Sequence, residues 1–379
     1  MTERFILIFD DNTDIIKNFN TAISQMGLSL SVKGYSDSKK FTEAINDWDI
    51  IGKTRVIIFD LAQNKSEEDT HIFRIKNTIA DNFDKYRIPL FIHSAFTDYF
   101  TDFDGKGTVF KIEKSGSSIK TICEKIKLFH ESNFLEIFRF GGILESNYLE
   151  QLHNAFTQQF KNNEIEKIIT SIKETSGDKY QERTAEVFRR IAVRSLFHNL
   201  TAVRKDKEGN LNEISLNYVE HYYRRCSTYD VWTGDIFRKK EAEETILVMT
   251  PRCDINKPRC KQILACKIVP LANLEINLEK NEIFQRAIND NLNLTSGSYR
   301  ILSASPLFKG GKIEYISPIT INRQSLIADY ELVVSLSDEL INDIVRKFSA
   351  YILRSGVSET EMEEAKKYME IIKQGEDDN

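Results

Sequence analysis

Short apolar runs that end abruptly in acidic residues are the feature that most constrains the fold of the first third of the chain. Phe5–Phe9 is apolar throughout and is followed at once by Asp10 and Asp11, and Arg55–Phe59 ends in the same way at Asp60. A run that is apolar at successive positions is typical of a parallel strand buried on both faces. The pattern therefore predicts a parallel sheet whose strands end in carboxylates.

Two further strands and the helices between them complete this pattern. Ile88–Ile92 leads to Ser94, Thr108–Ile112 leads to Lys114, and Val32 with Tyr35 indicates a short extra strand. Strands that alternate with helices predict a doubly wound sheet, in which ligands bind beyond the carboxyl ends of the strands. The helical spacing is carried by Ile15, Ile16, Phe19, Ala22, Ile23 and Met26, and then by Ile72, Ile75, Ile79 and Phe83.

The order of these polar residues resembles the receiver domain of bacterial response regulators. An acidic pair follows the first strand, a single Asp the third, a Ser the fourth and a Lys the fifth. The resemblance covers residues 1–130 and implies a flavodoxin-like fold, a Mg²⁺ cofactor and phosphorylation by a histidine kinase. The implied roles are phospho-acceptor for Asp60, metal ligands for Asp10, Asp11 and Asp60, and phosphoryl contacts for Ser94 and Lys114.

Elementary chemistry agrees with these roles. Clustered carboxylates suit Mg²⁺, a hard cation that prefers oxygen ligands, and attack by a carboxylate on phosphorus gives an aspartyl phosphate. A Lys ammonium is a compact charge that can pair with the phosphoryl oxygens, and Lys111 is the alternative to Lys114 for this part. The chain departs from the family at Ser115, where Pro is usual, and at Leu61–Gln63, where a Met-Pro turn is usual. A docking scaffold that is not phosphorylated remains an alternative.

Residues 131–228 predict a helical connector. Gly141 and Gly142 stop an aromatic-rich segment, and two long amphipathic helices follow them. Paired helices after a receiver suit signal transmission, and a homodimer formed through the connector is the expectation.

Residues 229–357 predict a small SH3-like β-barrel closed by a C-terminal helix. The segment that begins at Gly234-Asp235-Ile236 resembles the opening of the PemK/MazF-type toxin barrel, which makes a receiver-gated RNase an alternative function. Cys253 is a candidate thiol nucleophile, which makes a thiol enzyme another alternative. Residues 358–379 form an acidic tail. The predicted strands are Thr245–Thr250, Gln262–Pro270, Tyr299–Leu302, Ile313–Ile316 and Tyr330–Leu336.

Composition limits the remaining choices. A net charge of −5 gives no general attraction to nucleic acid or to an anionic membrane, so neither is an expected partner. Five cysteines without a disulfide-scaffold spacing, and no apolar stretch of membrane-spanning length, predict a cytoplasmic protein.

The fold class expected is a multidomain α/β + α + β chain. Its expected function is that of an atypical response regulator, a phospho-accepting signalling protein rather than an enzyme. Phosphorylated on Asp60 by a histidine kinase or phosphotransfer protein, it would relay or buffer a two-component phosphorelay through contacts with an unknown downstream protein. A stress or antiphage setting is a hypothesis.

Overall fold

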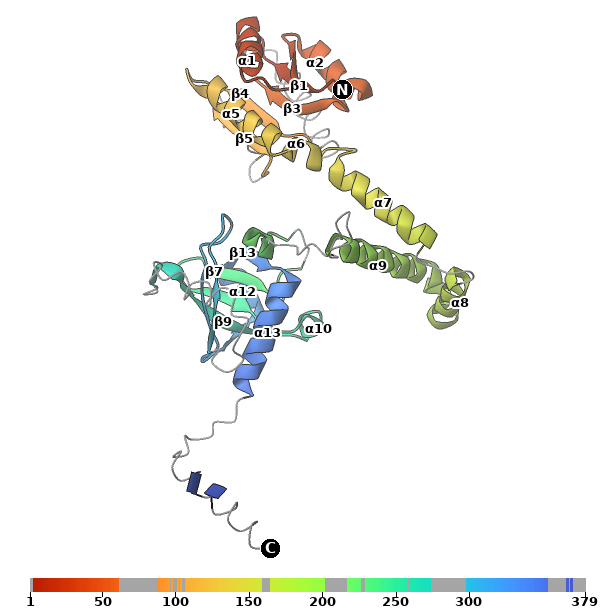
Figure 1. Ribbon diagram of the computed structural model, residues 1–379, viewed down its shortest axis with the longest axis vertical. Coiled ribbons are helices and arrows are strands. Elements are labelled where there is room, and N and C mark those ends of the chain that lie inside the picture. The colour runs from red at the N-terminus through yellow and green to blue at the C-terminus, as the bar shows by residue number, and fades with distance from the viewer. Residues whose placement is uncertain are drawn as a thin grey trace. The chain divides into compact units, whose positions relative to one another are not determined.

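The computed structural model divides the chain into two compact units, Met1–Val203 and Arg204–Asn379 (Figure 1). The boundary falls inside the predicted connector, and the predicted module limits at 130, 228 and 357 stay predictions. The predicted helix through Ile72 and Ile79 lies outside the described residues, as does most of the acidic tail. The structure describes residues 3–60, 87–95, 97, 101, 103, 106–158, 164–201, 217–225, 229–257, 259–273, 298–353, 366–367 and 369–370.

The first unit contains a five-stranded parallel sheet with the order β2-β1-β3-β4-β5. This is the flavodoxin-like doubly wound order, so the predicted fold of the first third is confirmed. The apolar runs account for the three central strands β1, β3 and β4, which are buried because both faces of the sheet are covered, whereas the edge strands β2 and β5 are only partly buried. The strands are β1 (Phe5–Phe9), β2 (Ser31–Tyr35), β3 (Thr54–Phe59), β4 (Leu90–Ser94) and β5 (Val109–Glu113).

Helices cover the two faces of this sheet. α1 (Thr13–Gln25) and α5 (Ser118–Glu131) share one core with Ile6 and Ile8 of β1. α2 (Ser38–Asn46) and α3 (Trp48–Ile51) share the opposite core with Phe5, Leu7 and Phe9. Successive residues of β1 therefore point to opposite cores, as the two-residue period of a strand requires.

Three long helices follow α6 (Phe134–Ile137) in the same unit. They are α7 (Ile143–Gln158), α8 (Glu164–Ser176) and α9 (Tyr180–Thr201), and α9 packs against both of the others. Wherever the structure describes exposure in these three helices, no residue is fully buried. This part of the unit has no closed core of its own.

The second unit is built on an eight-stranded antiparallel sheet with the order β10-β11-β9-β8-β7-β13-β6, and β12 pairs with β9. Of the predicted strands, Gln262–Pro270, Tyr299–Leu302 and Tyr330–Leu336 have the bounds of β9, β10 and β13. An SH3-like closure of this sheet stays a prediction. The other elements are β6 (Tyr222–Tyr223), β7 (Asp235–Lys239), β8 (Thr245–Val248), α10 (Arg252–Ile255), β11 (Gly311–Glu314), β12 (Ile319–Asn322), α12 (Arg323–Asp329) and α13 (Asp338–Ile352).

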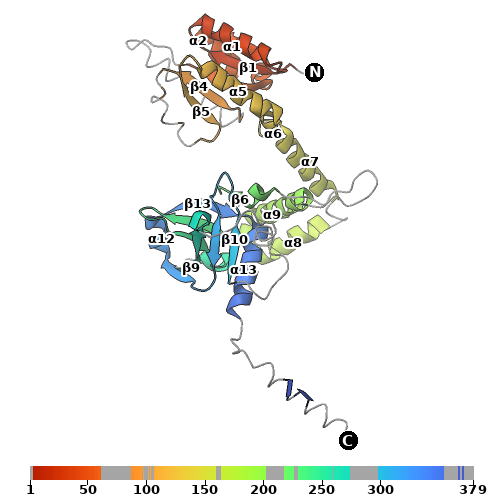
Figure 2. The same cartoon turned by 60° about the vertical axis from the view of Figure 1, so that its left-hand side comes forward.

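The closing helix α13 lies along this sheet, as Figure 2 shows. Leu340, Ile341 and Ile344 of the helix share a core with Ile236 of β7 and Val334 of β13. Ser337 caps the helix by accepting a hydrogen bond from the Leu340 N–H. No helix that the structure describes has the length and apolarity that a membrane crossing needs.

Candidate functional site

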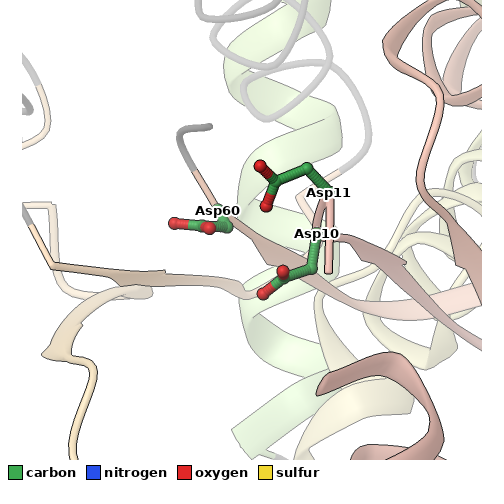
Figure 3. Close-up of side chains that lie close together, drawn as sticks. All are labelled: Asp10, Asp11 and Asp60. Atoms are coloured by element: carbon green, nitrogen blue, oxygen red, sulfur yellow. The ribbon is translucent and has the colours of Figure 1, made fainter. Parts of the chain in front are cut away.

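The carboxylates that follow β1 and β3 lie side by side, because these two strands are neighbours in the sheet. The Asp60 N–H donates to the Phe9 carbonyl over 2.9 Å, which fixes the end of β3 against the end of β1. Asp10 is 1% exposed and Asp60 is 4% exposed, whereas Asp11 is exposed. One ligand oxygen from each of the three lies within 4.8 Å of the other two (Figure 3). The predicted group of carboxylates is thus assembled at the carboxyl rim of the sheet.

Lys114 reaches this group from the end of β5. Its Nζ lies 2.9 Å from Asp10 Oδ2 and 2.5 Å from Asp60 Oδ2, so one ammonium bridges the two buried carboxylates. Its backbone N–H donates to the Ser94 carbonyl over 3.1 Å. The alternative lysine, Lys111, lies three residues earlier, within β5, where it is paired in register with Ile92 of β4. Both of these ion pairs are made by Lys114.

Ser94 and the second oxygen of Asp60 complete the buried side of the site. Ser94 is fully buried at the end of β4, and its side chain hydrogen-bonds Asp60. Asp60 Oδ1 is buried and has no hydrogen-bond partner among the residues that the structure describes. A buried carboxylate oxygen without a donor is costly, and a cation or a proton would relieve that cost.

The electrostatics follow from burial and from the shared lysine. Burial raises the pKa of Asp60 to about 6, the charge of Asp10 adds to this rise, and the hydrogen bonds from Lys114 and Ser94 oppose it. Burial also raises the pKa of Asp10, although Lys114 and the Asn12 N–H oppose the change. Burial alone would lower the pKa of Lys114, but its hydrogen bonds and ion pairs with the two carboxylates outweigh burial and raise it. The site therefore favours additional positive charge.

The three carboxylates fit Mg²⁺ on chemical grounds. They supply only oxygen donors, they gather at one point, and Asp60 Oδ1 has an unused lone pair. In the part of the chain that the structure describes, no other group of three His, Cys, Asp or Glu side chains has such close ligand atoms.

The cysteines offer no comparable arrangement. Cys253 is exposed on the short helix α10, where Asp254 beside it pairs with Lys257 at 2.6 Å. Cys266 is buried in β9, and burial raises its pKa to about 12. A role for Cys253 as a nucleophile stays a prediction.

A buried histidine beside the site was missed by sequence reasoning. His93 precedes Ser94 in β4, and its Nε2 lies 2.8 Å from Ser118 Oγ at the start of α5. Ser118 Oγ also bonds the backbone N–H and carbonyl of Ser115, at 3.1 Å and 2.8 Å. The available signal was a histidine inside an otherwise apolar strand, directly before a site residue.

Comparisons with known proteins give similarities of structure alone. No family model matches the chain, and no curated protein matches it. A receiver domain of a Francisella response regulator is 16% identical with a TM-score of 0.27, over 35% of this chain and 99% of that one. A receiver domain protein from Clostridium thermocellum is 15% identical with a TM-score of 0.27, over 35% and 99%.

A mycobacterial endoribonuclease in complex with its cognate antitoxin is 8% identical with a TM-score of 0.22, over 33% of this chain and 97% of that one. TM-scores and sequence identities this low give no evidence about the fold beyond the observed strand order. The flavodoxin-like assignment of the first third accordingly rests on its strand order.

Proposed function

We propose that the first third of the chain is a phospho-accepting receiver and that Asp60 is the acceptor. The observation that carries this proposal is the arrangement around Asp60. One carboxylate oxygen is bound by Lys114, the other is buried without a described partner, and Asp10 lies beside them. A carboxylate that was only structural would be expected to have both oxygens satisfied.

The proposed reaction needs little from the protein beyond position and charge. An oxygen of ionised Asp60 attacks the phosphorus of the donor, the new P–O bond forms, and the bond from phosphorus to the donor breaks with its electron pair leaving on the donor. Lys114 is placed to pair with the charge that gathers on the phosphoryl oxygens, and the Ser94 hydroxyl is placed to donate to one of them. Ser94 ends the buried strand β4 and Lys114 directly follows the half-buried strand β5, which limits the motion of both groups.

A Mg²⁺ ion held by Asp10, Asp11 and Asp60 would supply charge neutralisation for the incoming phosphoryl group. Without such a cation, the two buried carboxylates would repel an anionic donor.

Incubation of the full chain with acetyl phosphate and Mg²⁺ tests this proposal. Intact mass spectrometry should detect the gain of one phosphoryl group, which disappears in Asp60→Asn and persists in Asp49→Asn, an exposed aspartate on α3. No gain in the wild type would support the alternative of a scaffold that is not phosphorylated. A gain that survives in Asp60→Asn would move the acceptor elsewhere.

We further propose that phosphate arrives from a histidine kinase or phosphotransfer protein and that the helices α7–α9 join two copies of the chain. Support for the second part is the exposed apolar surface on two of these helices. Leu144 and Tyr148 lie one turn apart on α7, and Val193 and Phe197 lie one turn apart on α9. Apolar residues at helical spacing on helices without a closed core favour a partner helix.

Charge is complementary between α7 and α9, which pack against each other within one copy, and the same complementarity would favour their contact between two copies. α7 contains Glu145 and Glu150 and no Lys or Arg, whereas α9 contains four Arg and two Glu. Sedimentation equilibrium should give a dimer for the wild type and a monomer for Val193→Glu with Phe197→Glu. A wild-type monomer at tens of micromolar would count against the dimer and leave phosphorylation untouched.

A further inference from the structure

His93 occupies a position where a polar side chain is expensive. It is 2% exposed, and its ring lies nearly perpendicular to the ring of Phe19 from α1, at a centroid distance of 5.4 Å. Its Nδ1 has no hydrogen-bond partner among the residues described. Within the part of the chain that the structure describes, the ring therefore makes one hydrogen bond, between Nε2 and Ser118 Oγ at 2.8 Å. This hydrogen bond links β4, which contains His93, to the start of α5, which contains Ser118.

The contacts of Ser118 Oγ decide the direction of this bond. The hydroxyl has one proton, and the Ser115 carbonyl at 2.8 Å can only accept it. The Ser115 N–H at 3.1 Å can only donate to the hydroxyl oxygen. All three contacts form together when His93 carries its proton on Nε2 and donates to Ser118. The neutral ring then leaves a bare Nδ1 lone pair in the core, which costs less than a buried N–H without an acceptor.

These bonds connect two parts of the phosphoryl site. His93 directly precedes Ser94, and Ser115 directly follows Lys114. The Lys114 N–H donates to the Ser94 carbonyl over 3.1 Å, which ties the lysine backbone to the end of β4. The next N–H, that of Ser115, donates to Ser118 Oγ, which ties the same loop to the start of α5. Displacement of Ser115 would move the backbone from which the Lys114 side chain reaches Asp60.

We infer that His93 and Ser118 are positioning residues, which hold the loop after β5 through the backbone of Ser115 and so set the place of Lys114 over Asp60. They touch neither the donor nor the acceptor. This inference rests on the proposed phosphorylation of Asp60 for its functional meaning, but the positioning itself is a property of the protein without phosphate.

The alternative explanation is that His93 and Ser118 only stabilise the fold of the first unit and do not position Lys114. Two matched variants separate the two explanations. Ser117→Ala removes the neighbouring hydroxyl, which makes no capping hydrogen bond and is exposed. Phe91→Leu loosens the core two residues before His93 on the same face of β4, where the Phe91 ring stacks on Phe110 of β5.

The first measurement is amide hydrogen exchange of Lys114 in the full chain without phosphate. Ser118→Ala and His93→Leu should raise this exchange at least tenfold relative to the wild type, because the protecting bond to Ser94 opens with the loop. Ser117→Ala and Phe91→Leu should leave it within about twofold. In the wild type, the ¹⁵N signals of the His93 ring should be those of a proton on Nε2.

The second measurement is the rate of Asp60 phosphorylation by acetyl phosphate with Mg²⁺. Ser118→Ala and His93→Leu should lower it about tenfold, since small displacements of a charge-pairing group are costly to catalysis. His93→Gln, which can again donate an N–H to Ser118, should recover most of the rate.

Equal exchange and equal rates in Ser118→Ala and Ser117→Ala would overturn the inference. So would an equal loss of rate in Phe91→Leu, since the effect would then be general loosening, or a failure of His93→Gln to restore the rate. If the wild type accepts no phosphate, the proposed function fails, and the exchange of Lys114 still decides whether the loop is held in this way.

Discussion

Replacement of Asp60 by Asn should make the metal-free protein more stable at neutral pH, and the gain should vanish in acid. The pKa of Asp60 is about 6 in the fold and 3.8 in its absence, so the folded state binds the proton more tightly than the unfolded state does. Stability from this group is therefore complete below pH 3.8 and is lost as the pH rises through 6. Asn resembles the protonated acid and does not titrate.

The size of the effect follows from the same two values. Each pKa unit corresponds to about 1.4 kcal/mol, so ionised Asp60 costs the metal-free fold about 3 kcal/mol at pH 7. Asp60 is 4% exposed, so solvent screening does not remove this cost. The difference in unfolding free energy between Asp60→Asn and the wild type should thus grow by about 2.4 kcal/mol from pH 4 to pH 7, because Asp60 in the unfolded chain is already more than half ionised at pH 4.

Urea denaturation in the presence of a chelator measures this difference. Trp48 lies on α3 of the first unit, and a Trp232→Phe background lets it report on that unit alone. Asp49→Asn, an exposed change on the same helix, is the control and should show no such growth with pH. Added Mg²⁺ should stabilise the wild type and leave Asp60→Asn unchanged. A pH-independent difference between Asp60→Asn and the wild type would refute the account of Asp60 as a buried acid held at a cost.

Three further outcomes are expected. Glu136→Ala should cost about 3–5 kcal/mol in urea denaturation, because Arg55 is 6% exposed and would lose its carboxylate at 2.6 Å; a cost below about 1 kcal/mol would contradict this. Asp235→Ala should cost a similar amount in the second unit, followed by Trp232 fluorescence in a Trp48→Phe background, because the fully buried carboxylate accepts hydrogen bonds from Arg225, Ser335 and the Trp232 N–H. Unchanged stability there would mean that Arg225 finds solvent instead. Iodoacetamide at pH 8 should modify exposed Cys253 in the folded chain and reach Cys123 and Cys266 only in urea, since burial raises their pKa to about 11 and about 12; peptide mapping that finds either of them alkylated without urea would contradict their burial.

The strands and the carboxylate group could be predicted because both are written in local patterns. Phe5–Phe9 is a short apolar run that ends at Asp10, and its length and polar boundary favour a buried strand, so its bounds were predicted correctly. Asp10 and Asp60 lie 50 positions apart, yet their meeting follows from a rule of topology, since parallel strands end at the same rim.

The remaining polar contacts depend on register and packing that no local pattern contains. Arg55 meets Glu136 across 81 positions, and Asp235 meets Ser335 across 100. His93 occupies a strand position that an apolar residue would fill equally well, and its purpose is visible only once α5 brings Ser118 to it. The order of the eight strands in the second unit was beyond prediction for the same reason, because antiparallel strands can be paired in many ways.

The placement of the site also bears on how the chain matures. Its groups come from the ends of β1, β3, β4 and β5, and the last of them, Lys114, is made more than a hundred residues after Asp10. During synthesis, the carboxylates of Asp10 and Asp60 are therefore made before Lys114, the lysine that pairs with both of them. A slip of one residue in any of these strands would turn its terminal side chain to the other face. A divalent cation held by Asp10, Asp11 and Asp60 would thus report only that β1 and β3 are in register, whereas the Lys114 ion pairs form only once synthesis has passed residue 114 and β5 has joined the sheet.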